Sequence, residues 1–351
     1  MQLVAYGAQD IYLTGNPQIT FFKVVYRRHT NFSIESIEQT FNGTADFGKK
    51  VSATIARNGD LLHRVLLQVK LSSITTDATN YYKWVAWLGE RLLKHIDIEI
   101  GGQRIDRHYG EWLHIWSQLT LNSSQETGYK RMVGHTPDLL VPTTGATSTL
   151  PSTTLYIPLQ FWFCRNPGLA LPLIALQYHE VKINIEFNDL SDCLMKYSTT
   201  VPADFSQVTL TNTNVMESAS LWVDYIYLDT DERRRFAQLS HEYLIEQLQY
   251  PGEETISVTS NKIKLAFNHP VKELIWVVQR QSNIDAKQYF NYTSSYDGTI
   301  LSQDNSYGNH VLHSVKNSLE TTSNLKLQFI SNMEDTGVNN CSLAKLQLNG
   351  Q

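Results

Sequence analysis

The feature that most constrains this fold is a series of short segments in which apolar and polar side chains alternate. His95-Ile-Asp-Ile-Glu-Ile100 alternates at every position and ends at Gly101-Gly102, a turn signal. A period of two places the apolar side chains on one face of a β-strand. Further strand-like segments cover residues 19–26, 32–41, 50–56, 61–71, 155–163, 180–187 and 220–229. Many short strands with few helices predict an antiparallel sandwich rather than alternating βα units.

Two segments have a helical pattern instead. Trp112, Ile115, Trp116 and Leu119 share one helix face, which predicts a short amphipathic helix over residues 111–119. Asp229 to Gln238 begins with a capping residue and an acidic turn and continues with Arg233-Arg234-Arg235, the charge order that the helix dipole favours. We expect a helical connector there, with a domain boundary near residue 235.

Strand patterning starts again after the connector. The segments expected to form strands are residues 243–248, 261–267, 274–279, 324–330 and 343–348. Residues 134–154 and 291–309 are predicted to be surface loops, the first because it is rich in Thr, Ser, Pro and Gly. The chain therefore divides into two β units joined by a helix.

Composition limits the possible functions. Hydrophobic residues make up 42% of the 351-residue chain, enough for a sizeable core, while charged residues make up only 18%. A protein with so little charge either hides much of its surface or sits in a polar, uncharged environment. The net charge of −5 argues against sequence-independent binding of nucleic acid, and Arg233-Arg234-Arg235 is interpreted as a solvated or salt-bridged turn. Cys164, Cys193 and Cys341 are too few and too scattered for a disulfide framework or a zinc site, which favours a reducing compartment.

The sequence predicts neither catalytic, cofactor-binding nor metal-binding residues. His108 and His114 do not form chelating pairs, and the neighbours in His179-Glu180 and His241-Glu242 would point to opposite faces of a strand. Patterns for a nucleophile elbow, a phosphate loop or a zinc site are not found. Trp84, Trp87 and Phe161-Trp-Phe163 are expected in the core rather than on a stacking platform.

No signal peptide or membrane-spanning stretch is apparent, so we expect synthesis in the cytoplasm.

Five sequons are present, at Asn31, Asn42, Asn122, Asn291 and Asn340. Without a signal peptide, ordinary secretory glycosylation is not expected at these positions. The interpretation is that they are plain polar loop residues.

Three longer stretches resemble one protein family. They are residues 2–32, which include Ile19-Thr-Phe-Phe-Lys-Val-Val-Tyr26, the stretch Leu171-Pro-Leu-Ile-Ala-Leu-Gln-Tyr-His-Glu-Val-Lys-Ile183, and residues 221–246. All three are similar to major capsid proteins of nucleocytoplasmic large DNA viruses, the phycodnavirus, mimivirus and iridovirus group. These matches are long and spread over much of the chain, so they are more specific than a short motif.

The resemblance implies an all-β fold, a double jelly roll of two consecutive eight-stranded antiparallel sandwiches. Its implied divisions are an N-terminal arm at residues 1–19, a first jelly roll at 20–228, the connector at 229–240 and a second, incomplete jelly roll at 241–351. It implies a homotrimer that forms pseudo-hexagonal capsomers of an icosahedral shell, with neighbouring capsomers and minor capsid proteins as partners. The arm would lie on the inner side of the shell, and the inner face would be able to contact an internal membrane layer.

Two alternatives remain open from the sequence. One is a minor capsid protein of the same double-roll class, which would not form trimers with itself. The other is a carbohydrate-binding or glycoside-cleaving sandwich, which would need exposed aromatic residues on one sheet face.

At the C-terminal side, Asn349-Gly350 is a hairpin signal without a returning strand. We therefore expect the intact gene product to be longer and the 351-residue form to assemble poorly.

Overall fold

A computed structural model describes most of the chain. The described residues are 31–76, 80–140, 143, 149–198, 215–256, 261–285, 287–292, 341 and 343–347. The predicted strand at residues 19–26 and the N-terminal arm at 1–19 lie outside them.

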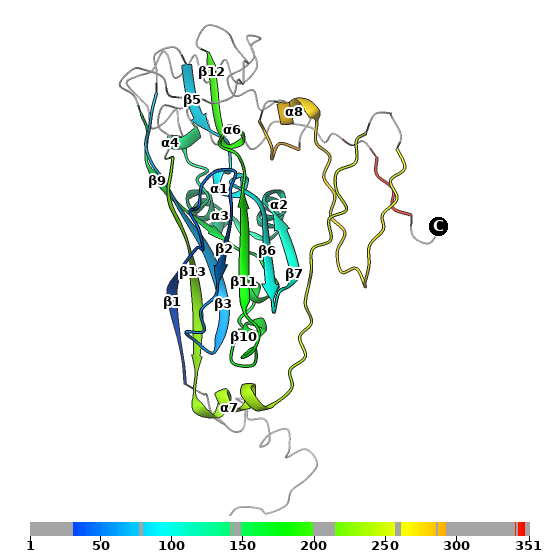
Figure 1. Cartoon of the computed structure of the whole chain (residues 1–351). Helices are drawn as coiled ribbons and strands as arrows, with labels where there is room; N and C mark the ends of the chain where they lie inside the picture. Colours follow the sequence, from blue (N-terminus) through cyan, green and yellow to red (C-terminus); the bar gives the residue numbers. More distant parts are fainter. Residues whose placement is uncertain are drawn as a thin grey trace, which may run out of the picture.

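The first sheet contains the longest strands of the described chain (Figure 1). In spatial order they are β1 (Phe32–Thr40), β13 (Met216–Leu228), β3 (Leu61–Leu71) and β10 (Leu171–Pro172), with β9 (Thr153–Pro158) also paired to β3. All these pairs are antiparallel. The predicted strands at 32–41, 61–71 and 220–229 are therefore confirmed.

The second sheet faces the first. Its order is β2 (Lys50–Thr54), β11 (Val181–Phe187), β6 (Leu93–Ile100) and β7 (Gln103–Tyr109). Two short pairs complete the strands, β5 (Asn80–Trp84) with β12 (Leu194–Ser198) and β4 (Ile74–Thr75) with β8 (Thr149–Leu150).

The core lies between the two large sheets because one face of each strand is apolar, as the alternation predicts. Leu67 and Val223 from the first sheet and Ile98 and Ile183 from the second are fully buried in one cluster. Burial of a side chain of this size contributes about 1.5–3 kcal/mol. Two antiparallel sheets connected across the core in this order form a jelly roll, which occupies residues 32–228 and is called the first roll below.

Helices fill the ends and sides of the first roll. They are α1 (Leu88–Arg91), α2 (Gly110–Thr120), α3 (Ser123–Met132), α4 (Pro137–Leu140), α5 (Trp162–Arg165), the 3-10 turn η2 (Pro167–Leu169), α6 (Leu190–Cys193) and, just after the last strand, α7 (Thr230–Gln238). Helix α8 (Gln281–Asp285) belongs to the later part of the chain. The predicted helix at 111–119 is confirmed as α2. Helix α3 was not predicted, although a capping box of Asn122 and Gln125 marks its start.

Helix α7 confirms the helix predicted in this segment. The Asp229 carboxylate accepts a hydrogen bond from the Thr230 N–H at 2.7 Å and caps the helix. Arg233 donates from Nε and Nη2 to the buried carboxylate of Asp60 at 2.9 and 3.0 Å, and the Leu228 N–H donates to the same carboxylate at 2.8 Å. The helix is thereby attached to the turn between β2 and β3, and this fixes the direction in which the chain leaves the roll.

The prediction that residues 134–154 form a surface loop is wrong for much of that segment. It contains α4, β8 and the start of β9. Leu139, Leu140 and Leu150 are 2%, 1% and 0% exposed, so the segment contributes to the core. Its Thr, Ser, Pro and Gly content concealed these leucines, whose burial outweighs the local loop preference.

The described residues after α7 differ from the first roll. Residues 243–248, 261–267 and 274–279 were expected to be strands, but the structure describes them without strand pairing. A strand requires a neighbouring strand for its N–H and C=O groups, and within the described residues these segments have none. Figure 1 shows this part running in an extended path beside the roll. The second jelly roll at 241–351 therefore stays a prediction. Among the helices described, none is long and apolar enough to cross a membrane.

Candidate functional interface

The histidines considered in the sequence analysis contact neighbouring groups of the protein. His179 packs against Gly101, whose φ is +61° and where a Cβ atom would lie 2.7 Å from His179 Nδ1. His241 Nε2 lies 2.9 Å from the carbonyl oxygen of Phe236. Across the described residues, no group of three His, Cys, Asp or Glu side chains is placed to hold a metal ion.

His114 belongs to a buried polar cluster beneath helix α2. The fully buried carboxylate of Glu90 lies 2.7 Å from His114 Nδ1, and the Tyr129 hydroxyl donates to it at 2.7 Å. Ser117 also donates to this carboxylate at 3.3 Å. Burial raises the pKa of Tyr129 far above its usual value, so its hydroxyl remains a donor. The cluster connects α1, α2 and α3 and lacks an exposed reactive group, so its role is structural.

His135 is the neighbour of this cluster. Its ring stacks on Trp87 with 4.3 Å between centroids, and burial lowers its pKa to about 3. Trp87 adopts φ +56° and is only partly buried, packing against His135 and His114 instead of the main core. The core prediction is confirmed for Trp84 and for residues 161–163, which are at most 2% exposed.

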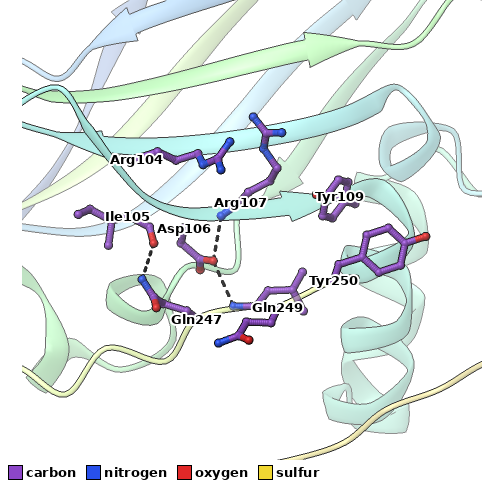
Figure 2. Close-up of a pocket in the computed structure, with 9 residues that line it drawn as sticks. Arg104, Ile105, Asp106, Arg107, Tyr109, Gln247, Gln249 and Tyr250 are labelled. Carbon is purple, nitrogen blue, oxygen red and sulfur yellow. Dashed lines mark hydrogen bonds between the residues drawn. The ribbon is translucent and has the colours of Figure 1, made fainter. Parts of the chain in front are cut away.

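Strand β7 contacts the chain that follows the connector. His108 Nε2 lies 2.9 Å from Asp106 Oδ2 in the interior, while Asp106 Oδ1 accepts the Leu248 N–H at 3.1 Å. The Gln247 amide donates to the Ile105 carbonyl. Figure 2 shows the contacts of Ile105 and Asp106 with residues 247–250. A cavity of about 290 Å³ lies between the strand and this segment. Of its polar groups, Asp106 and Gln247 attach the segment, whereas Arg107 pairs with Asp97 of the roll.

A second set of contacts lies beside this cavity. The Arg165 guanidinium stacks on Trp116 at 3.9 Å and pairs with Glu246 at 3.1 Å. Tyr109 meets Tyr250 edge to face with 5.1 Å between centroids. Residues 246–250 therefore attach to the first roll through side chains rather than through strand pairing. These contacts could not be predicted from the sequence, because a local pattern does not report which distant segments meet.

The remaining features considered in the sequence analysis are the cysteines, the arginine cluster and the sequons. Cys164 and Cys193 are buried, and burial raises the pKa of each thiol to about 12. Arg233 is salt-bridged, as expected for the arginine cluster. The sequon residues Asn31, Asn42 and Asn122 are exposed, and Asn291 is half-buried. Asn340 lies outside the described residues.

Two family models together match nearly the whole chain. Residues 20–229 match the major capsid protein N-terminus, and residues 232–351 match the large eukaryotic DNA virus major capsid protein. The boundary between the two matches coincides with the start of α7.

Named relatives agree with these models. A major capsid protein of Pyramimonas orientalis virus is 61% identical, and the match covers 86% of this chain and 69% of that protein. A major capsid protein of Phaeocystis pouchetii virus is 54% identical over 85% of this chain and 64% of that protein. The chain thus spans roughly two thirds of the length of these curated relatives.

A solved structure resembles the fold as well. A chain of the PBCV-1 virus capsid is 42% identical and superimposes with a TM-score of 0.55. The match covers 72% of this chain and 57% of that chain. Solved relatives confirm the all-β, double jelly roll fold class predicted from the sequence. The chain belongs to the family of major capsid proteins of large eukaryotic DNA viruses.

Proposed function

We propose that this chain is a structural building block of an icosahedral virus shell, in which three copies form a pseudo-hexagonal capsomer. The observation that supports this most is the match of both halves of the chain to capsid family models, together with the jelly roll at residues 32–228. Its place would be the virion, after synthesis in the host cytoplasm.

The surface of the first roll suits such burial by neighbours. Only 18% of the residues of the whole chain are charged. Large apolar or aromatic side chains project from the roll, with exposed fractions of 68% for Phe32, 56% for Ile34 and 93% for Tyr178. In obligate assemblies, residues of this kind lie in the interface.

The partners follow from the same role. They are further copies of the chain, neighbouring capsomers and minor capsid proteins, and the inner face would be able to contact an internal membrane layer. Direct sequence-specific nucleic acid binding is not proposed, because the net charge is −5 and base contacts require a docked reading element. Enzymatic activity, cofactors and bound metals are not part of the proposal, since the family is structural.

A minor capsid protein of the same class is the second candidate and differs in assembly. The test is light scattering of the natural gene product after size-exclusion chromatography. A particle three times the mass of a single chain is expected, and a monodisperse monomer at micromolar concentration would contradict the proposal. Binding to an array of glycans would instead favour the carbohydrate-binding alternative.

A further inference from the structure

Helix α1 ends in an arginine that is held in place by the first roll. The Arg91 side chain is only 13% exposed, and its Nη1 atom lies 3.1 Å from Glu111 Oε1. Asp192 Oδ2 lies 3.9 Å from its Nη2 atom, and the Arg91 carbonyl accepts the Asn188 amide at 2.7 Å. Because all these partners belong to the roll, the position of the guanidinium does not depend on the later chain.

Residues 279–285 and 287–292, called the clasp, form a loop with its own hydrogen bonds. The Gln279 amide donates to the carbonyls of Gln288 at 3.2 Å and Tyr289 at 2.8 Å. Asn283 is 1% exposed, and its amide donates to the Asn291 carbonyl at 2.9 Å. Side-chain amides thus close the loop, which reduces the entropy lost when it docks.

The clasp meets the first roll through Lys287, Tyr289 and Phe290. The Tyr289 ring centroid lies 3.4 Å from Arg91 Cζ, and the Tyr289 hydroxyl donates to Asp192 at 3.4 Å. The Phe290 ring stacks on His114 with 4.4 Å between centroids. Lys287 has φ +58° and directs its ammonium group to the carbonyl oxygens of Ser191 and Leu194.

We propose that the face formed by α1, α2 and α6 is a docking surface whose occupant is the clasp, and that Arg91 is the residue that positions it. The clasp has its own hydrogen bonds, Arg91 has partners within the roll, and the contact pairs a cation with an aromatic ring at short range. The left-handed backbone at Lys287 costs energy for a residue with a Cβ, and the contacts of its ammonium group with Ser191 and Leu194 offset part of that cost.

The clasp gives the second half of the chain a separate attachment from the one at β7. Residues 246–250 attach near Asp106, whereas the clasp attaches near Arg91. One attachment point would allow the following segment to rotate about it. Two points fix its direction relative to the roll.

The test uses the full chain and the rate of tryptic cleavage after Lys287, followed by mass spectrometry. Tyr289→Ala is expected to accelerate cleavage about tenfold, because the undocked lysine becomes accessible to the protease. Tyr289→Phe retains the ring and is expected to remain within about twofold of the wild type. Arg91→Lys retains the charge without the planar stacking group and is expected to resemble Tyr289→Ala. Leu239→Ala, a change at an exposed apolar residue outside both the first roll and the clasp, is the matched control.

The double variant Arg91→Lys/Tyr289→Ala decides whether the two residues act together. Cleavage no faster than in the single variants is expected, because each change removes the same contact. Multiplied effects, or an unchanged rate for Tyr289→Ala, would overturn the proposal. Circular dichroism melts of each variant monitor the first roll, and a variant with a lost or lowered melt counts against a local clasp.

Discussion

Replacement of Glu90 by alanine tests whether the buried polar cluster stabilises the first roll. Glu90 is 0% exposed, and its carboxylate is the shared partner of His114 and Tyr129, each at 2.7 Å. The change removes that acceptor while both partners stay buried, and it leaves a cavity. Ser117 is less affected because its hydroxyl also donates to the His114 carbonyl at 2.7 Å.

The expected loss is large for a single substitution. Each buried donor without a partner costs about 1–3 kcal/mol, and removal of one member of a buried pair costs about 3–5 kcal/mol in total. For a domain of this size, that corresponds to a fall in melting temperature of roughly 10 °C. Urea unfolding followed by circular dichroism measures the free energy, and differential scanning calorimetry measures the melting temperature.

Two further variants make the result specific. Glu90→Gln retains an oxygen that accepts from Tyr129 and is expected to lose less stability than Glu90→Ala. Glu126→Ala removes a carboxylate whose side chain is 41% exposed and pairs with Lys130 four residues later, so its loss should be at most about 0.5 kcal/mol. A loss for Glu90→Ala no larger than that for Glu126→Ala would refute the reasoning.

Three other outcomes are expected. Asp60→Ala should destabilise the chain by about 1–3 kcal/mol in urea unfolding, because the Leu228 N–H loses its acceptor. Arg233→Ala should cost less, because Asp60 still accepts the Leu228 N–H and the Arg233 side chain is 51% exposed in the folded protein; equal losses would contradict this. Cys164 and Cys193 should resist iodoacetamide in the folded protein, because burial raises the pKa of each thiol to about 12; mass spectrometry of folded and urea-unfolded samples checks this, and equal labelling would be the contrary result. Burial raises the pKa of Tyr289 from 10.0 to about 12, so its contribution to stability is complete below pH 10 and lost as the pH rises through 12; tyrosinate absorbance compared with that of Tyr289→Phe detects this titration, and ionisation near pH 10 would argue against burial.

Much of the first roll was predictable because its strands have one face in the core and one toward solvent. That arrangement produces the alternation at residues 61–71 and 95–100, which the structure confirms as β3 and part of β6. The connector was predictable for a different reason, since capping and charge order are local properties of a helix. Both signals are visible within about ten residues.

The contacts after the connector were not predictable in this way. Residues 243–248 have the composition of a strand, yet the structure describes them attached to β7 through side chains. Strand composition indicates that a segment is able to pair, but the pairing itself depends on which other segments are near. The same limit applies to Arg91 and Tyr289, which are far apart in sequence and have no motif that announces their contact.

The register of the first sheet has a consequence for how such a molecule grows. Phe32 at the start of β1 is paired with Leu228 at the end of β13, so the chain enters and leaves the roll at one end. A second domain can therefore follow residue 228 without its chain passing through the first roll and without separating a pair of strands. Gene duplication of the unit would yield a tandem protein in a single step, each copy retaining its own folding nucleus.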